Sequence, residues 1–231
     1  MIRLTVLLTF ISLVAFSQQE NVFLTRKVNK GIYYTYQQFL TNSPAETDNF
    51  TCKPVDKTYL FVPNSTFIMS YTLYPNKTGK DTTQLMYMLY DSIKKNRKIT
   101  KAYAFCDGKD VFINSALYQN HSNYYLKVLD FGRILYTRDP IMDQAAGVGT
   151  GAILGGLIGG AIGYLSANKD SRGVIIFCED GGVPFILNRQ TITSLLQNYA
   201  PDLYKKYQAE ADRGDEAVLE KYVLLFNQQY P

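Results

Sequence analysis

Short runs of apolar residues, separated by prolines and asparagines, predict a sheet of short strands. Strands are expected within residues 52–75, at TYLFV and TFIMSYTLY, where Val, Phe, Thr and Tyr dominate. The apolar run at 84–91 fits a buried strand or a helix, and its aromatic content favours a strand. Residues 123–139 predict further strand, broken at Asp130 or Gly132.

Two stretches with a shared pattern predict two similar β-hairpins. AYAFCDGKDVFIN, residues 102–114, places alternating strands around Asp107 and Gly108, a pair that favours a two-residue type I′ turn. IFCEDGGVPFILN, residues 176–188, repeats the order of aromatic residue, cysteine, acidic residue and glycine. The repeat predicts two similar hairpins with Cys106 and Cys178 at equivalent strand positions, and it leaves open whether the two hairpins share one sheet.

One short helix is predicted early in the chain. Thr35 is expected as the N-cap, with Gln38 closing a capping box and Tyr34 packing on Phe39 as a hydrophobic staple. The helix is expected to end before Pro44, because Asn, Ser and Pro follow one another there.

The last forty residues are predicted to be helical. A short helix is expected at 192–199, and Pro201 at a first helical position begins another that Gly214 would end. Asp215 is expected to cap a final helix. Its predicted apolar face consists of Val218, Tyr222, Leu225 and Phe226.

The stretch from 145 to 167 differs from the rest, because it has no charge and holds eight of the sixteen glycines. A glycine costs ~1 kcal/mol relative to alanine in a helix, so a helix here would need lipid or a packed partner. Its 23 residues would reach ~35 Å, enough for a hydrocarbon core of ~30 Å. The glycines that recur every four residues, and would line one side as a helix-packing groove, are Gly147, Gly151, Gly155, Gly159 and Gly163.

Three alternatives remain for this segment. A helix that leaves the sheet and returns on the same side, as an interfacial element or oligomer contact, is the first. A single membrane span is the second, although it would separate two hairpins of one sheet. A flexible glycine loop is the third, and the bulky Ile, Leu and Tyr side chains oppose it.

Residues 1–17 predict a secretory signal peptide. Arg3 precedes an apolar run, and Ala15 and Ser17 stand at the −3 and −1 positions of a cleavage site. No cysteine follows that site, which opposes a lipoprotein anchor. Removal of Arg3 leaves 23 basic and 20 acidic residues, a balance too small to imply nucleic acid as a partner.

These elements predict an α+β fold whose domain is antiparallel and β-rich. The 19 tyrosines, with no tryptophan, favour half-buried strand surfaces with solvated hydroxyl groups. The predicted organisation is a signal peptide at 1–17, a β-rich domain at 18–144 and 168–190, the glycine-zipper segment at 145–167 and helices at 191–231.

Few residues in the sequence indicate a catalytic or metal-binding site. His121 is the sole histidine and has no nucleophile motif near it, and the three cysteines show no zinc spacing, so we predict no enzyme, no cofactor and no metal. Cys106 and Cys178 occupy equivalent hairpin positions and are a candidate disulfide in an oxidising compartment. Two buried free thiols are the alternative.

A basic cluster follows the strand predicted at 84–91. Five basic residues fall within eight positions: Lys94, Lys95, Arg97, Lys98 and Lys101. They could contact anionic lipid headgroups, or form a solvated turn.

Several motifs resemble those of uncharacterised secreted proteins of Bacteroidota bacteria. These are GIYYTYQQFLTNSP, AYAFCDGKDVFIN, SLLQNYAPDLYKKY and VLEKYVLLFN, together with a signal peptide that ends in Phe-Ser before Gln. The resemblance implies an envelope protein of a Gram-negative cell and transfers no catalytic residue.

The favoured hypothesis is a non-catalytic exported envelope protein, tethered or assembled through residues 145–167. Its expected location is the periplasm or the outer membrane, and its expected partners are a membrane, another envelope protein or a second copy of the chain. The alternative is a soluble periplasmic binding module for a peptide, glycan or lipid, in which the glycine segment is only an insertion.

Overall fold

A computed structural model describes the strands, the helices and most of the connections between them. The described ranges are 21–55, 58–61, 69–72, 85–94, 97–118, 124–139 and 173–230. The signal peptide predicted at 1–17, the segment predicted at 145–167 and His121 lie outside them.

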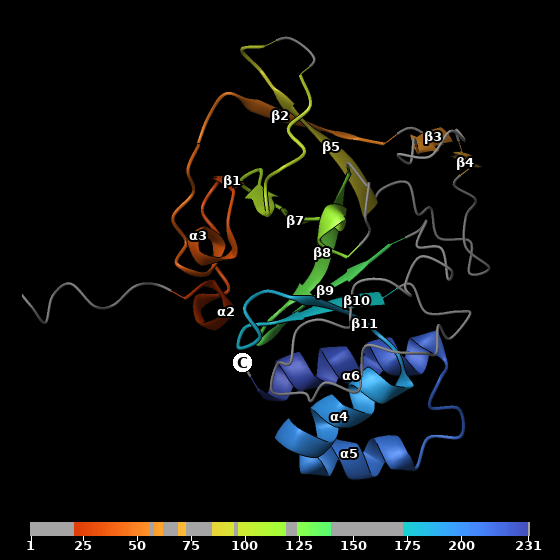
Figure 1. Cartoon of the computed structure of the whole chain (residues 1–231). Coiled ribbons are helices and arrows are strands. Elements are labelled where there is room, and N and C mark those ends of the chain that lie inside the picture. The colour runs from red at the N-terminus through yellow and green to blue at the C-terminus, as the bar shows by residue number, and fades with distance from the viewer. Residues whose placement is uncertain are drawn as a thin grey trace, which may run out of the picture.

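Nine of the described strands form one open antiparallel sheet, and two more form a separate hairpin (Figure 1). Together with the helices, this gives a mixed α and β fold with an antiparallel sheet. The strands of the sheet are β1 (Gly31–Tyr33), β2 (Phe50–Pro54), β5 (Met86–Asp91), β6 (Ala104–Cys106), β7 (Val111–Asn114), β8 (Tyr125–Phe131), β9 (Ile134–Arg138), β10 (Gly173–Phe177) and β11 (Pro184–Ile186). The separate hairpin is β3 (Thr58–Phe61) with β4 (Met69–Thr72).

The sheet is forked at β8. Its main path runs β1-β6-β7-β8-β9-β10-β11, and β5, with β2 beside it, also pairs with β8. β5 pairs with the first residues of β8, where Met86 lies opposite Leu126. β9 pairs with the later residues of β8. Thr137 lies opposite Val128, and the register shifts between Val128 and Asp130. The two branches therefore diverge from neighbouring positions on one strand.

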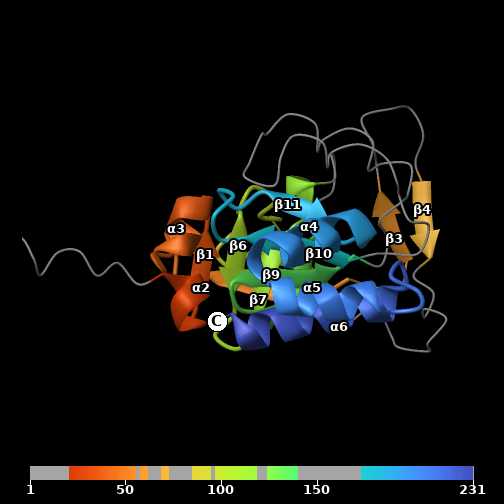
Figure 2. The same cartoon turned by 90° about the horizontal axis from the view of Figure 1, so that it is seen from below.

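The described helices lie at two places on the sheet. They are α2 (Val22–Thr25), α3 (Tyr36–Leu40), α4 (Arg189–Tyr199), α5 (Pro201–Gln208) and α6 (Glu216–Gln229), with a short 3₁₀ turn at Ser115–Leu117. Figure 2 shows α5 and α6 across one face of the β9-β10 region and α2 and α3 beside β1.

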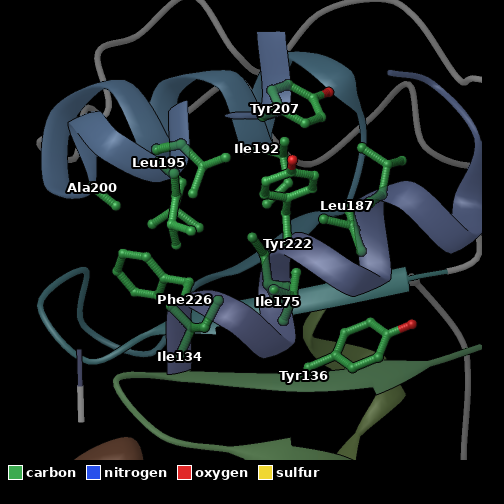
Figure 3. Packing of buried hydrophobic residues seen from close by; sticks show 14 of the residues in the cluster. Ile134, Tyr136, Ile175, Leu187, Ile192, Leu195, Ala200, Tyr207, Tyr222 and Phe226 are labelled. Atoms are coloured by element: carbon green, nitrogen blue, oxygen red, sulfur yellow. The ribbon is translucent and has the colours of Figure 1, made fainter. Parts of the chain in front are cut away.

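Strands β9 and β10 are covered on both faces, which explains why almost all of their residues are buried. Ile134 and Tyr136 face α4, α5 and α6, and Figure 3 shows them below Phe226 and Tyr222. Leu135, between them in sequence, packs on the other face with Phe23 and the residues around α2 and α3. This alternation is the two-residue period of a strand.

Both predicted hairpins lie in the one sheet, as β6-β7 and β10-β11. The prediction of a two-residue turn at Asp107 and Gly108 was wrong. Cys106 pairs with Val111, so the loop has four residues. The Asp107 carboxylate accepts from the backbone N–H groups of Lys109 and Asp110, both at 2.8 Å, and this side-chain turn replaces the type I′ geometry.

The capping box is confirmed. The Thr35 side chain accepts from the Gln38 backbone, and the Gln38 side chain accepts from the Thr35 N–H. The hydrophobic staple is not formed: Tyr34 is 37% exposed and donates its hydroxyl to Glu46, while Phe39 is buried among other rings.

The C-terminal helices are confirmed, with two corrections. α5 ends at Gln208 rather than at Gly214, and the Tyr207 hydroxyl donates to the Arg213 carbonyl oxygen in the connection that follows. On α6, Asp215 is the N-cap as predicted. Its fully buried face is Leu219, Tyr222, Val223 and Phe226, and Val218 and Leu225 are only partly buried.

Many tyrosines lie deeper than composition suggested. Eight have 9% exposure or less, so they are core residues rather than half-buried ones: Tyr33, Tyr103, Tyr118, Tyr124, Tyr125, Tyr136, Tyr207 and Tyr222. Most of their hydroxyl groups bond to protein groups, as buried hydroxyls require.

Candidate functional site

The candidate site is the base of the segment that connects β9 to β10. These strands are antiparallel neighbours, and Arg138 lies directly opposite Gly173. Paired Cα atoms of an antiparallel ladder are about 4.5–5.5 Å apart. The chain therefore leaves the sheet after Arg138 and rejoins it at an adjacent position, with residues 139–172 between.

A buried carboxyl group begins this connection. Asp139 is 0% exposed, and its Oδ2 accepts hydrogen bonds from the hydroxyl groups of Tyr118 and Tyr124, both at 2.7 Å. Burial, followed by the proximity of Asp139, raises the pKa of Tyr118 well above its usual value, so this hydroxyl stays protonated and keeps donating. These two hydrogen bonds hold Asp139, the first residue of the connection, near β8, where the sheet forks.

The fork explains how these three residues meet. Tyr124 immediately precedes β8, Asp139 immediately follows β9, and Tyr118 follows the 3₁₀ turn after β7. Both tyrosine rings pack in the cluster beneath β5 with Met86 and Val174. The diverging branches leave room for the rings, and their hydroxyl groups reach the chain end of β9.

Two further contacts stabilise the base of the β9–β10 connection. A Cβ atom at Gly173 would approach the Leu187 side chain to 2.8 Å, so a larger residue would push β10 from the chain that follows β11. Arg138 forms a salt bridge of 2.5 Å with Glu216, and the two side chains are only 15% and 22% exposed. This pair ties the end of β9 to the first turn of α6.

Tyr136 presents a buried hydroxyl next to this base. Its ring lies against Ile175 in the helix-covered cluster (Figure 3). The oxygen has no hydrogen-bond partner, and burial raises its pKa, with Glu220 adding to the rise and Arg138 opposing it. An unpaired hydroxyl in this position destabilises the fold unless a water molecule reaches it.

Cys106 and Cys178 are free thiols in the structure, so the predicted disulfide is not present in it. β7, β8 and β9 lie between their strands in the sheet. Cys106 accepts from the Gly108 N–H at 3.4 Å, whereas Cys178 contacts the Asn21 amide at 3.6 Å. The hairpins are equivalent in sequence, but they are not neighbours.

The arrangement at the base is a buried, hydrogen-bonded cluster. Asp139, Tyr118 and Tyr124 are buried together, and both tyrosine hydroxyl groups donate to the Asp139 carboxylate. Within the described ranges, no group of three or more His, Cys, Asp or Glu side chains could hold a metal ion. The five glycines predicted to pack, Gly147 to Gly163 at every fourth residue, lie outside those ranges.

Sequence reasoning missed the Asp139 cluster. Tyr118 and Tyr124 come from the β7–β8 connection and Asp139 from the β9–β10 connection, and no spacing relates them. The one local signal was a carboxylate that follows Arg138 at the end of a strand whose first four residues are buried, where a charge is expensive without partners.

One family model, described as a family of unknown function (DUF6563), matches residues 31–230. The chain belongs to this family. The DUF6563 match begins at β1 and extends to the residue after α6, so the family region contains the whole described sheet and both ends of the 139–172 connection. No curated protein and no solved structure matches the chain.

Among the described residues, no helix is both long and apolar enough to cross a bilayer.

Proposed function

We propose that this chain is a non-catalytic exported protein of the cell envelope, whose sheet domain holds residues 145–167 as a tethering or assembly element. The observation that carries the proposal is the direct pairing of Arg138 with Gly173. Residues 139–172 connect neighbouring strands, and Ile134–Arg138 and Gly173–Phe177 pair directly with each other along their whole length.

The pairing favours a path that returns to its starting side. A single crossing would bring the two ends of the segment to opposite faces of a hydrocarbon core of about 30 Å. The ends instead join adjacent strands, and the hairpins β6-β7 and β10-β11 lie in one sheet. We therefore favour an interfacial or oligomer-forming element, packed through Gly151, Gly155 and Gly159, over a single span.

The base of the connection supports an anchoring role. Asp139 with its two tyrosines, and the Arg138–Glu216 pair, hold the exit point to the fork and to α6. A force applied to residues 145–167 would therefore act on the sheet and on α6 together. The alternative is a soluble module with a tyrosine-lined ligand surface, and it loses support because eight of the 19 tyrosines are core residues that cannot line such a surface.

The test replaces residues 145–167 with a Gly-Ser linker of equal length in the full chain. Because the neighbouring strands pair without it, this variant should keep its circular dichroism spectrum and cooperative melting. It should leave the membrane pellet, or lose its oligomeric state in mild detergent, whereas the wild-type chain resists a high-salt wash.

Two point variants refine the test. Gly155→Leu should abolish association by blocking close helix approach, although leucine gains ~1 kcal/mol of helix propensity. Ile153→Leu, on the bulky side, is the matched control and should associate normally. Equal association of the linker variant and the wild type would overturn the proposal, and the soluble binding module would replace it.

A further inference from the structure

The loop after β5 concentrates the charge of the whole protein. Residues 91–101 contain five of the 24 basic residues and one of the 20 acidic residues, which gives the loop a net charge of +4. The net charge of the entire chain is also +4, so all other residues together are neutral. A neutral body with one cationic loop would orient that loop toward a negatively charged surface.

The loop also exposes a large aliphatic side chain. Ile93 is 70% exposed, and it stands between the strand end at Asp91 and the cations Lys94, Arg97 and Lys98, all of them exposed. An isoleucine that is 70% exposed buries little apolar area in the fold. The same combination suits a bilayer surface, where the cations meet headgroups and the aliphatic group enters the boundary with the acyl chains.

The described part of this loop is held by hydrogen bonds. The Asp91 Oδ1 accepts from the backbone N–H groups of Ile93 at 2.8 Å and Lys94 at 2.9 Å, and these bonds lower the pKa of its carboxyl group. The Asp91 N–H donates to the Arg97 carbonyl oxygen, and the Arg97 N–H donates to that of Lys94, both at 2.9 Å. The one acidic group is therefore engaged by backbone, and the Ile93 backbone is held by one of these bonds.

The position of the loop permits contact with a flat surface. Figure 1 shows it projecting from the end of the molecule opposite α5, beyond β2 and β5. The bridge between Tyr90 and Lys98 and the bond from the Ser92 N–H to the Asn49 carbonyl oxygen at 2.8 Å fasten its base.

From exposure, charge and position we infer that the loop at 91–98 is a second contact site, which binds the surface of a bilayer that contains anionic phospholipid. The inference concerns residues other than 145–167 and does not depend on their role.

The experiment measures sedimentation of the full chain with vesicles of phosphatidylcholine alone and of phosphatidylcholine mixed equally with phosphatidylglycerol. Binding through the loop should need the anionic lipid and should disappear at about 1 M salt, where the Debye length is about 3 Å. Binding that persists in salt or on neutral vesicles reports the glycine segment, so the two contributions separate.

Two loop variants and two controls decide the matter. Lys94→Gln with Lys98→Gln should weaken the salt-sensitive binding about 25-fold, at about fivefold per cation, and Ile93→Ser should weaken it about tenfold. Leu24→Ser changes an equally exposed apolar residue on α2, and Lys205→Gln changes an exposed cation on α5; neither should alter binding.

Wild-type binding by both loop variants would overturn the inference. So would a loss in the lysine variant with none in Ile93→Ser, because the loop would then bind anionic headgroups through charge alone, without the aliphatic contact that the inference includes. Folding should be unaffected in either variant, since Ile93 and Lys94 enter the loop's hydrogen bonds through backbone amides, which substitution retains.

Discussion

At the scale of single residues, Asn227 shows how one buried side chain can dock a helix on a sheet. Its Oδ1 accepts from the Ile134 N–H at 3.0 Å, and its Nδ2 donates to the Ile134 carbonyl oxygen at 2.8 Å and to Asp130 at 2.7 Å. A Cβ atom at Gly132 would lie 2.7 Å from the Asn227 side chain, so only glycine permits this approach at the β8-β9 turn. Asn227 is 2% exposed, so its side chain is almost entirely excluded from solvent.

Asn227→Leu is expected to destabilise the protein by about 2–4 kcal/mol, because it leaves both backbone groups of Ile134 and the Asp130 carboxylate without this partner. Urea denaturation followed by circular dichroism would measure the change. Gln228→Leu, at the next and exposed position of α6, is the matched control and should change the free energy of unfolding by less than about 0.5 kcal/mol. Similar values for the two variants would contradict this account.

At the scale of elements, local capping determines where the helices begin. Asp215 accepts from the backbone N–H groups of Ala217 at 2.9 Å and Val218 at 3.2 Å, and it also suits the positive end of the α6 dipole. α5 has no side-chain cap and begins with Pro201, whose missing N–H needs no partner.

Asp215→Ala should lower the free energy of unfolding by about 1 kcal/mol, and Asp215→Asn should restore most of it, since asparagine caps as well as aspartate does. Thermal unfolding of the three proteins at one pH gives the comparison. Should alanine and asparagine prove equally damaging, the charge at Asp215 would matter more than its hydrogen bonds.

At the scale of the whole molecule, the large number of buried tyrosines makes stability depend on alkaline pH. Burial raises the pKa of several hydroxyl groups well above the usual value of 10.0, and those that are 9% exposed or less include Tyr103, Tyr118, Tyr125 and Tyr136. A raised pKa in the folded state contributes stability that is complete below pH 10 and is lost as the pH rises toward that folded value.

Stability should therefore be level near neutral pH and fall above pH 10, by about 1.4 kcal/mol per pH unit for each tyrosine that ionises only on unfolding. Tyrosinate absorbance and circular dichroism, recorded on one alkaline titration, are the measurements. Both signals should change together for the buried groups. Full ionisation near pH 10 with a native spectrum would show that these hydroxyls are reached by solvent.

Interactions within a few residues could be predicted from the sequence. The capping box at Thr35 and Gln38 and the cap at Asp215 were predicted correctly, because each depends on groups three residues apart or fewer. Most of the strands were also recognised, since the two-residue period and the aromatic content are local properties, but β1 and β2 were not. The repeated pattern predicted two hairpins, and the structure places both of them in one sheet.

Other features were decided only when distant segments met. The fork at β8, the pairing of Arg138 with Gly173 and the meeting of Asp139 with Tyr118 and Tyr124 involve connections whose sequences carry no mark of each other. Phe39 left its predicted staple because a buried cluster of rings offered it more contact than Tyr34 could. The sequence alone determined most of the elements and the helix caps at Thr35 and Asp215, since these depend on neighbours along the chain. The end of α5 and the length of the β6-β7 loop were not predicted correctly. The tertiary structure decided which elements pair and which polar groups are buried together, because those energies come from contacts between residues far apart in the sequence.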